Sequence, residues 1–341
     1  MKSSRKASVL TVIALLVTCA AAFAQQTQLP RAGMKGMHFG APPSSSQPGV
    51  AAMNRSSAAR QSQSPTLSLT WGIYTFPGAV GSLTAGVTKS GHILGAYGPN
   101  IDAGSNSNYG FLLKSGKFAT ISYPGAAWTQ PNGINDAGVI VGGYGASLTD
   151  EHGFRLAGTT YTPIDYPGAT ATFPFGINKS GSIVGEWIDA GGSLHGFLLS
   201  KNAYTSIDAP GAIYTFAEGI NNGGEICGWY LDGSFTFHGF LLQGGTFTTF
   251  DYPGDSNNYV ADINDNGVIA GGYGDPVVVN GVTYYWPHSY VYQNGTFTTF
   301  DAPFGPPAAT QIWHLNNYGV ITGNYIDNSG TSYGFEVTVG Q

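Results

Sequence analysis

The segment Gly176-Ile-Asn-Lys-Ser-Gly-Ser-Ile-Val-Gly-Glu-Trp187 decides the fold, because its pattern recurs along the chain. The general form is Gly-Ile-Asn-x-x-Gly-x-Ile-Val-Gly-x-Tyr, and the other copies begin at Gly86, Gly133, Gly219, Asp262 and His314. Successive copies start 47, 43, 43, 43 and 52 residues apart. Self-similarity at a period of about 43 residues predicts a repeat architecture.

Two further elements recur with it in fixed order. One is His-Gly-Phe-Leu-Leu, which begins at His195 and His238 and, in weaker form, at Tyr109, His152, His288 and Tyr333. The other is aromatic-x-x-apolar-x-x-Pro, as in Phe247-Thr-Thr-Phe-Asp-Tyr-Pro253. Each unit therefore predicts four short strands: two flank the Asn-x-x-Gly turn, one is Gly-Phe-Leu-Leu, and one is the aromatic segment that Pro ends. Consecutive apolar residues in the second strand indicate that both of its faces are covered.

The order of these elements predicts a closed ring. Four strands in about 43 residues are typical of a β-propeller blade, and six copies predict six blades. The aromatic strand Trp71–Phe76 precedes the first unit, whereas the last unit stops after its third strand, Gly334–Val339. The N-terminal strand can therefore complete the C-terminal blade. We expect an all-β, six-bladed propeller of four-stranded antiparallel blades over residues 67–341.

The combined pattern resembles the HAF family of extracellular bacterial repeat proteins over about residues 70–339. The resemblance implies an exported, propeller-like protein, and it supplies no catalytic residues that could be transferred to this chain. Two units depart from the pattern, with Val87-Thr88 in place of Ile-Asn and Ser289-Tyr290 in place of Gly-Phe.

The part before the repeats predicts an export signal and a spacer. A positively charged start, an apolar stretch and the cleavage site Ala22-Phe23-Ala24 are typical of a secretory signal peptide, here residues 1–24. Cys19 leaves a lipoprotein anchor as the alternative. Residues 25–66 are rich in Ser, Pro, Gln and Ala and predict a flexible spacer. We therefore expect a secreted or periplasmic bacterial protein.

Composition narrows the class of partner. Only 9% of the residues are charged and 13% are aromatic, which excludes a coiled coil and wholesale disorder. Without the predicted signal and spacer, the chain carries 6 Lys and Arg against 19 Asp and Glu. Such a surface repels phosphate groups, so nucleic acid is not an expected partner. No stretch after the signal is long enough for a membrane span, and Cys227 is expected to be a small buried residue.

Irregular loops indicate a candidate site. Between the second and third strands, four units use 9 residues, but the first uses 13 and the fifth uses 16. The connection into the last unit is also longer, with 13 residues instead of 11. These three insertions would lie on one face of neighbouring blades, where loops on a rigid scaffold commonly bind ligands. The candidate ligand-binding residues are Tyr284, Tyr285, Trp286, His288, Phe304, Trp313, His314, Asn100 and Asp102.

A second candidate region is the central channel. The residue before the Gly-Ile position of the innermost strand differs from unit to unit, being Ala85, Asn132, Phe175, Glu218, Ala261 and Trp313. This variation indicates either relaxed filling or a tailored lining, and the candidate channel-lining residues are Asn132, Phe175 and Glu218.

Recurring polar residues predict structural roles rather than a metal site. His152, His195, His238 and His288 occupy one repeat position, so we expect each to bond within its own blade. The segment that begins at Asp262 matches the start of a calcium loop, but Tyr273 stands where a bidentate Glu is needed. We expect a structural hairpin there, and no metal or cofactor.

Three classes of function remain open. The first is an exported non-catalytic binding or scaffold propeller, engaging a glycan or a protein at the cell surface through the loops of blades five, six and one. The second is a carbohydrate-active enzyme, either a glycoside hydrolase or a polysaccharide lyase. No catalytic residue is assigned, because hydrolysis needs two nearby carboxylates and neither Glu186 nor Glu218 has an evident partner. The third is a structural envelope protein.

Overall fold

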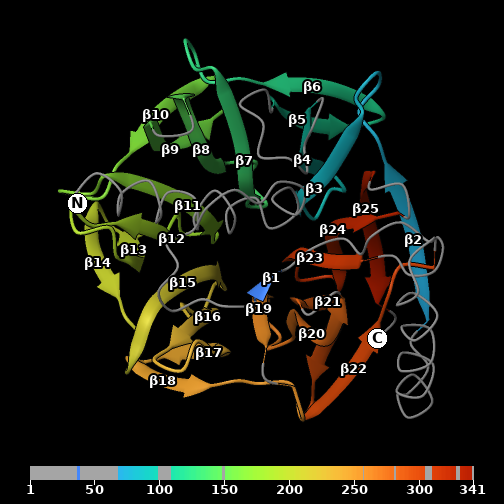
Figure 1. Ribbon diagram of the computed structural model, residues 1–341. Helices are drawn as coiled ribbons and strands as arrows, with labels where there is room; N and C mark the ends of the chain where they lie inside the picture. Colours follow the sequence, from blue (N-terminus) through green and yellow to red (C-terminus); the bar gives the residue numbers. More distant parts are fainter. Residues whose placement is uncertain are drawn as a thin grey trace.

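A computed structural model describes residues 37–38, 68–98, 109–147, 150–255, 257–279, 282–303, 309–327 and 331–339. Six four-stranded antiparallel sheets surround a central axis like blades (Figure 1), which confirms the predicted fold class. In each blade the first strand lies nearest the axis and the fourth lies at the rim. None of the described residues forms a helix long and apolar enough to cross a membrane.

The first three blades follow one another along the chain. Blade one comprises β3 (Gly81–Val87), β4 (Ile93–Gly98), β5 (Tyr109–Lys114) and β6 (Lys117–Ile121). Blade two comprises β7 (Trp128–Ile134), β8 (Ile140–Ser147), β9 (Asp150–Ala157) and β10 (Thr160–Ile164). Blade three comprises β11 (Ala171–Ile177), β12 (Ile183–Ile188), β13 (Leu194–Ser200) and β14 (Ala203–Ile207).

The last three blades include the longest hairpin and the closing strand. Blade four comprises β15 (Ala212–Ile220), β16 (Ile226–Asp232), β17 (Phe237–Gln243) and β18 (Thr246–Thr249). Blade five comprises β19 (Asn258–Ile263), β20 (Ile269–Val279), β21 (Val282–Gln293) and β22 (Thr296–Phe300). Blade six comprises β23 (Ala309–Leu315), β24 (Val320–Ile326), β25 (Ser332–Val339) and the N-terminal β2 (Leu69–Tyr74).

The ring closes as predicted. Strand β2 pairs antiparallel with β25, in a register that places Leu69 opposite Val339 and Tyr74 opposite Gly334. Blade one is tied to blade six as well, because the Thr84 hydroxyl lies 2.7 Å from the carbonyl oxygen of Gly323. The two ends of the propeller therefore share one blade, and no open sheet edge is left between them.

The Asn-x-x-Gly turns explain why Asn recurs at the end of each first strand. The side-chain oxygen of Asn178 accepts hydrogen bonds from the amides of Ser180 and Ser182, at 3.1 and 3.0 Å, and so holds its own turn. Gly181 follows at φ 81°, a left-handed conformation that suits glycine. The Asn178 amide nitrogen then donates to the carbonyl oxygen of Asn221 in the next blade. One residue thus holds a turn and joins two blades.

The core lies between the blades rather than in one central layer. The third strands bury an aromatic side chain almost completely in every blade, namely Phe111, Phe154, Phe197, Phe240, Tyr290 and Phe335. Cys227 is fully buried in β16, as expected. A second-strand aromatic side chain also packs between blades, since Tyr144 stacks on Tyr123 of the connection from blade one, with ring centroids 3.5 Å apart.

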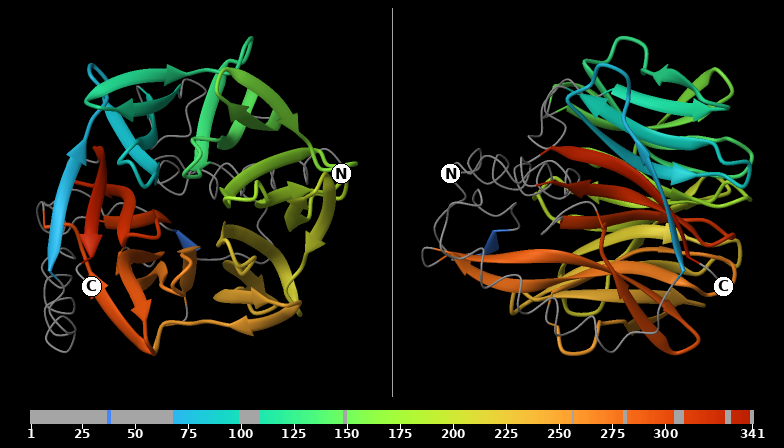
Figure 2. Two further views of the ribbon diagram at one scale, coloured as in Figure 1. Left: turned by 180° about the vertical axis from the view of Figure 1, so that it is seen from behind. Right: turned by 90° about the vertical axis from the view of Figure 1, so that its right-hand side faces the viewer.

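The segment before the propeller is described only at β1 (Met37–His38), which pairs in parallel with β21. The predicted signal peptide, residues 1–24, and the remainder of the predicted spacer lie outside the described residues. The hairpin of β20 and β21 extends beyond the neighbouring blades (Figure 2, right). We call the side where the second and third strands connect the loop face, and the side of the Asn-x-x-Gly turns the turn face.

Candidate functional site

Each innermost strand carries a β-bulge at the same place. The register between first and second strands skips one residue in every blade, and the skipped residues are Ala85, Asn132, Phe175, Glu218, Ala261 and Trp313. A bulged residue is left unpaired and its side chain is re-aimed. The position that varies most between units is therefore the one that the backbone turns out of the sheet.

Five of these six residues line a cavity on the axis. The cavity has a volume of about 100 Å³, and all six blades contribute to its wall. Asn132, Phe175, Glu218 and Trp313 are among the lining residues, together with turn residues such as Lys179. The cavity therefore lies toward the turn face, opposite the long β20–β21 hairpin. We call Asn132, Phe175, Glu218, Asp262, Trp313 and His314 the channel site.

The position after the bulge is glycine in blades one to four but not in blades five and six. A Cβ atom on Gly176 would lie 2.7 Å from the carbonyl oxygen of Glu218, so the close approach of the next blade requires glycine here. Blades five and six carry Asp262 and His314 at this position, and their side chains pair, with His314 Nδ1 2.7 Å from Asp262 Oδ2. The same carboxylate oxygen accepts the Leu315 amide at 2.9 Å.

This pair is largely buried, with side-chain exposures of 22% for His314 and 8% for Asp262. Burial lowers the pKa of His314, but the charge and hydrogen bond of Asp262, with smaller contributions from the Val87 backbone and Asp136, together outweigh that effect, so the pKa is raised from its usual value. The imidazole is thereby held close to a carboxylate on the channel wall, where an ordinary repeat has only glycine.

Two glutamates of neighbouring blades form an acid pair, Glu186 on β12 and Glu218 on β15. Trp229 Nε1 donates to Glu218 Oε1 at 2.9 Å. Burial and the charge of Asp262 raise the pKa of Glu218 to about 7, although the Trp229 bond opposes them. Burial and the charge of Glu218 raise the pKa of Glu186 well above its usual value. The sequence pattern shows no evident carboxylate partner for either residue, whereas in the structure the charge of Glu218 acts on Glu186.

Glu186 is the more buried member of the acid pair. It is 2% exposed, and its Oε2 atom has no hydrogen-bond partner among the residues that the structure describes. A buried carboxyl without a partner is costly in its charged form, so it holds its proton. Glu218 lines the cavity, whereas Glu186 is not among the lining residues.

Aromatic side chains complete the channel site. Phe175 and Trp313 line the cavity, and Trp313 Nε1 donates to Asn324 Oδ1 at 2.7 Å, which fixes the indole. Trp229 is 8% exposed and stacks on Phe216 with ring centroids 3.7 Å apart. The site therefore combines aromatic faces with an amide, two carboxylates and a carboxylate-bound imidazole.

Three of the nine predicted loop-face residues have described side chains, and these three lie in two different places. Trp313 and His314 lie on the innermost strand β23 and face the channel. His288 stays within its own blade, where its Nδ1 is 2.8 Å from Asp301 Oδ2. The backbone of Tyr284, Tyr285 and Trp286 belongs to the extended part of β21. Phe304, Asn100 and Asp102 lie outside the described residues.

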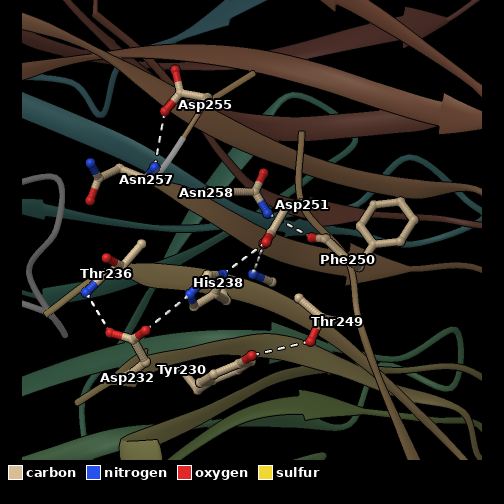
Figure 3. Close-up of polar contacts among 11 residues, drawn as sticks. Tyr230, Asp232, Thr236, His238, Thr249, Phe250, Asp251, Asp255, Asn257 and Asn258 are labelled. Carbon is tan, nitrogen blue, oxygen red and sulfur yellow. Dashed lines mark hydrogen bonds and ion pairs between the residues drawn. The ribbon is translucent and has the colours of Figure 1, made fainter. Parts of the chain in front are cut away.

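The four recurring histidines bond within their blades, as expected. Figure 3 shows the arrangement in blade four, where His238 lies between two carboxylates. Its Nδ1 is 2.8 Å from Asp251 Oδ2, and its Nε2 is 3.5 Å from Asp232 Oδ2. His238 also stacks on Tyr230, at 5.2 Å between ring centroids. Equivalent contacts to the residue 13 positions later hold His152, His195 and His288.

Sequence reasoning missed Glu186, Trp229 and Asp262 as members of one region. A usable signal was present, because acidic residues at these positions are exceptions to the repeat. Glu186 is the only acidic residue at its position in the second strands, and Asp262 replaces a glycine that four other units keep. Their closeness depends on packing between blades, which the repeat pattern does not encode.

No protein-family model and no curated protein matches the chain. Among solved structures it is similar to TolB from Acinetobacter baumannii, with 12% identity, a TM-score of 0.45, and coverage of 69% of this chain and 60% of TolB. It is similar to an Aleuria aurantia lectin mutant in complex with alpha-methyl-L-fucoside, with 8% identity, a TM-score of 0.48, and coverage of 76% and 93%.

A third similar structure is YCF48 bound to a D1 peptide, with 11% identity, a TM-score of 0.44, and coverage of 82% of this chain and 100% of that one. The chain thus spans about 60% of the length of TolB but nearly all of the other two proteins. At these identities the likeness concerns the fold alone.

Proposed function

We propose that this protein is an exported, non-catalytic binding propeller that takes a saccharide in its central channel. One observation carries the proposal: the bulges bring two aromatic side chains, an amide and a carboxylate from four different blades to one cavity. Flat aromatic faces stack on the apolar faces of sugar rings, and a few polar groups fix their orientation. Export is supported by the signal-like pattern of residues 1–24.

The location differs from the loop-face site that the insertions suggested. Trp313 and His314 link the two hypotheses, because both were candidates there and both line the channel. The aromatic residues Tyr284, Tyr285 and Trp286 belong to the hairpin on the loop face. A test can therefore separate the two faces with tryptophan substitutions alone.

The experiment is a glycan array followed by calorimetry on three proteins: wild type, Trp313→Ala and Trp286→Ala. We expect Trp313→Ala to weaken saccharide binding at least tenfold, because the channel loses its main aromatic face. Trp286→Ala should bind like wild type. Melting temperatures check that both variants are folded.

Other results would move or remove the site. If only Trp286→Ala weakens binding, the ligand sits on the hairpin of the loop face. If no glycan binds to the folded wild type, the saccharide proposal is wrong, and pull-down from a bacterial envelope extract then tests a protein partner.

One observation favours an enzyme as the second candidate. The acid pair has the composition of a hydrolytic centre, in which one carboxyl donates a proton and another stabilises the sugar. Against it, Glu186 does not reach the cavity wall. Release of reducing ends from a bound polysaccharide that stops in Glu218→Gln would establish the enzyme.

A further inference from the structure

The lining of the channel contains more acidic side chains than basic ones. The charged lining residues are Asp136, Lys179, Glu218, Asp262, Asp265 and His314. The imidazole of His314 is paired with the carboxylate of Asp262 and so does not offset Glu218. Lys179 lies at the turn face. Among the described residues, Glu218 has one hydrogen-bond donor, Trp229, and no cation within ion-pair distance. Its carboxyl is therefore available to a ligand. It differs from the other acidic groups of the wall in its position, because Glu218 lies at a bulge of the innermost strand whereas Asp136 and Asp265 lie in the turns.

Glu186 makes this carboxyl unusual. The carboxyl of Glu186, in the neighbouring blade, interacts electrostatically with Glu218; it is 98% removed from solvent and has an oxygen with no partner among the described residues. The charge of Glu218 raises the pKa of Glu186, because two negative charges in a dry environment repel each other, so the two carboxyls are not expected to be charged together. Replacing either glutamate by an apolar residue would remove the unfavourable free energy of burying two interacting carboxyls. A role in packing alone therefore does not explain why both residues are glutamate.

Two aromatic rings share the cavity wall with Glu218, and a third contacts its carboxyl. Phe175 and Trp313 line the cavity, and Trp229 donates its N–H to Glu218. The faces of such rings attract cations, and Trp is the most effective of them. Aromatic faces next to a carboxyl are the chemistry that recognises an organic ammonium group.

We infer that the channel site selects saccharides that carry a protonated amino group, and that the bound ammonium displaces a proton from the Glu186–Glu218 pair. The inference rests on the proposed function, because it requires a saccharide in the channel. The step is balanced: the ammonium keeps its three protons, a carboxyl becomes a carboxylate, and the released proton passes to the buffer. No bond of the sugar is broken.

The pKa values agree in direction with this step. Burial, followed by the Asp262 charge, raises the pKa of Glu218 to about 7, so this carboxyl is mostly protonated in mildly acidic solution. A bound cation would lower that pKa and release the proton. The other titratable groups of β15 and of the strands packed on it are Tyr214 on β15, Glu186 on β12, His195 on β13, Cys227, Tyr230 and Asp232 on β16, and Tyr259 and Asp262 on β19; His314 on β23 faces Asp262.

The test uses the disaccharide of glucosamine and its N-acetylated form, which differ in charge but share the sugar skeleton. Calorimetry is performed at about pH 6, where the amino groups are protonated, in two buffers of different ionisation enthalpy. We expect the amino form to bind about tenfold more tightly and to release close to one proton. The acetylated form should release none.

Two variants assign the effect. Glu218→Gln should bring the affinities for the two disaccharides within about twofold and reduce the proton release, while the protein stays folded. Glu336→Gln is the matched control, because it removes the same charge from β25, where Glu336 bonds to Tyr74 away from the channel. It should behave like wild type.

The outcomes separate this inference from the proposed function. If both disaccharides bind equally and Trp313→Ala weakens both without proton release, the channel binds saccharides but the inference about charge is wrong. If neither these disaccharides nor any glycan on the array binds, the proposed function fails and the inference fails with it. If Glu336→Gln changes the selectivity as much as Glu218→Gln, overall charge is responsible and the inference is overturned.

Discussion

The side-chain amide of Asn178 donates a hydrogen bond to the main-chain carbonyl oxygen of Asn221 in the next blade, 3.1 Å away. Equivalent bonds run from Asn135 to Asn178, from Asn221 to Asn264 and from Asn264 to Asn316. Blade one has Thr88 at this position, whose hydroxyl accepts the His92 amide but carries no amide to donate onward. We call this series of hydrogen bonds between blades the asparagine ladder. At blade one, threonine takes the place of the asparagine.

This relationship gives a pair of opposite predictions. Asn178→Thr, which copies blade one, should lower the free energy of unfolding by about 1–3 kcal/mol, because the buried Asn221 carbonyl loses its donor. Thr88→Asn should raise it by about 0.5–1.5 kcal/mol by adding a donor toward blade two. Urea denaturation of both variants measures the two changes. Equal destabilisation by both substitutions would mean that the ladder contributes nothing across the blades.

Closure of the ring predicts a sharp boundary for truncation. A chain that starts at residue 67 keeps β2 and should melt cooperatively, close to the temperature of a chain that starts at residue 25, because among the described strands it loses only the two-residue β1. A chain that starts at residue 75 loses β2, leaves the edge of β25 unpaired, and should fold poorly or associate. Circular dichroism melts and size-exclusion chromatography distinguish these outcomes. Normal folding of the shorter chain would show that blade six is stable with three strands.

The repeat made much of the fold predictable. A feature that recurs in every unit, such as the Asn178 turn, serves the structure of each blade. It can therefore be predicted from a single sequence. The closing strand was predictable for a related reason: the missing strand of the last unit and the extra strand before the first one complement each other. These features depend on neighbours within about 43 residues or on a simple count of strands.

The candidate site was less predictable, because it arises from exceptions and from packing between blades. Glu186 and Glu218 lie on different strands of adjacent blades, and the bulge that re-aims Glu218 is not visible as a motif. The longer connection before blade six was interpreted as a loop insertion that carries Trp313 and His314. Strand β23 already covers 309–315, so these residues belong to the inner wall instead.

The approach of Asp262 to Gly219 predicts a coupled pair of substitutions. A Cβ at Gly219 would lie 2.3 Å from Asp262 Oδ1, so Gly219→Ala should destabilise the protein by about 1–3 kcal/mol. Asp262→Gly, which restores the residue of the other units, removes the nearest obstructing atom. In the double variant we expect a favourable coupling of about 0.5–2 kcal/mol, measured by a double-mutant cycle in urea. Gly233→Ala is the control, because a Cβ there meets no atom within 4 Å. Strict additivity would contradict the contact.

Glu151 on β9 predicts a stability that falls as the pH rises. Its side chain is 6% exposed, and its Oε2 atom has no hydrogen-bond partner in the described part of the chain. Burial, followed by the charge of Asp150, raises the pKa of Glu151 from 4.5 to about 8. Because the folded state holds this proton more tightly than the unfolded state, the stability that the proton contributes is complete below about pH 4.5 and is lost as the pH rises to about 8.

Glu151→Gln keeps the shape of the protonated acid, so the substitution should be nearly neutral at pH 5 and stabilising by about 1–3 kcal/mol at pH 8. Urea denaturation at the two pH values supplies its own control, and an equal effect at both would show that the proton on Glu151 has no part in stability.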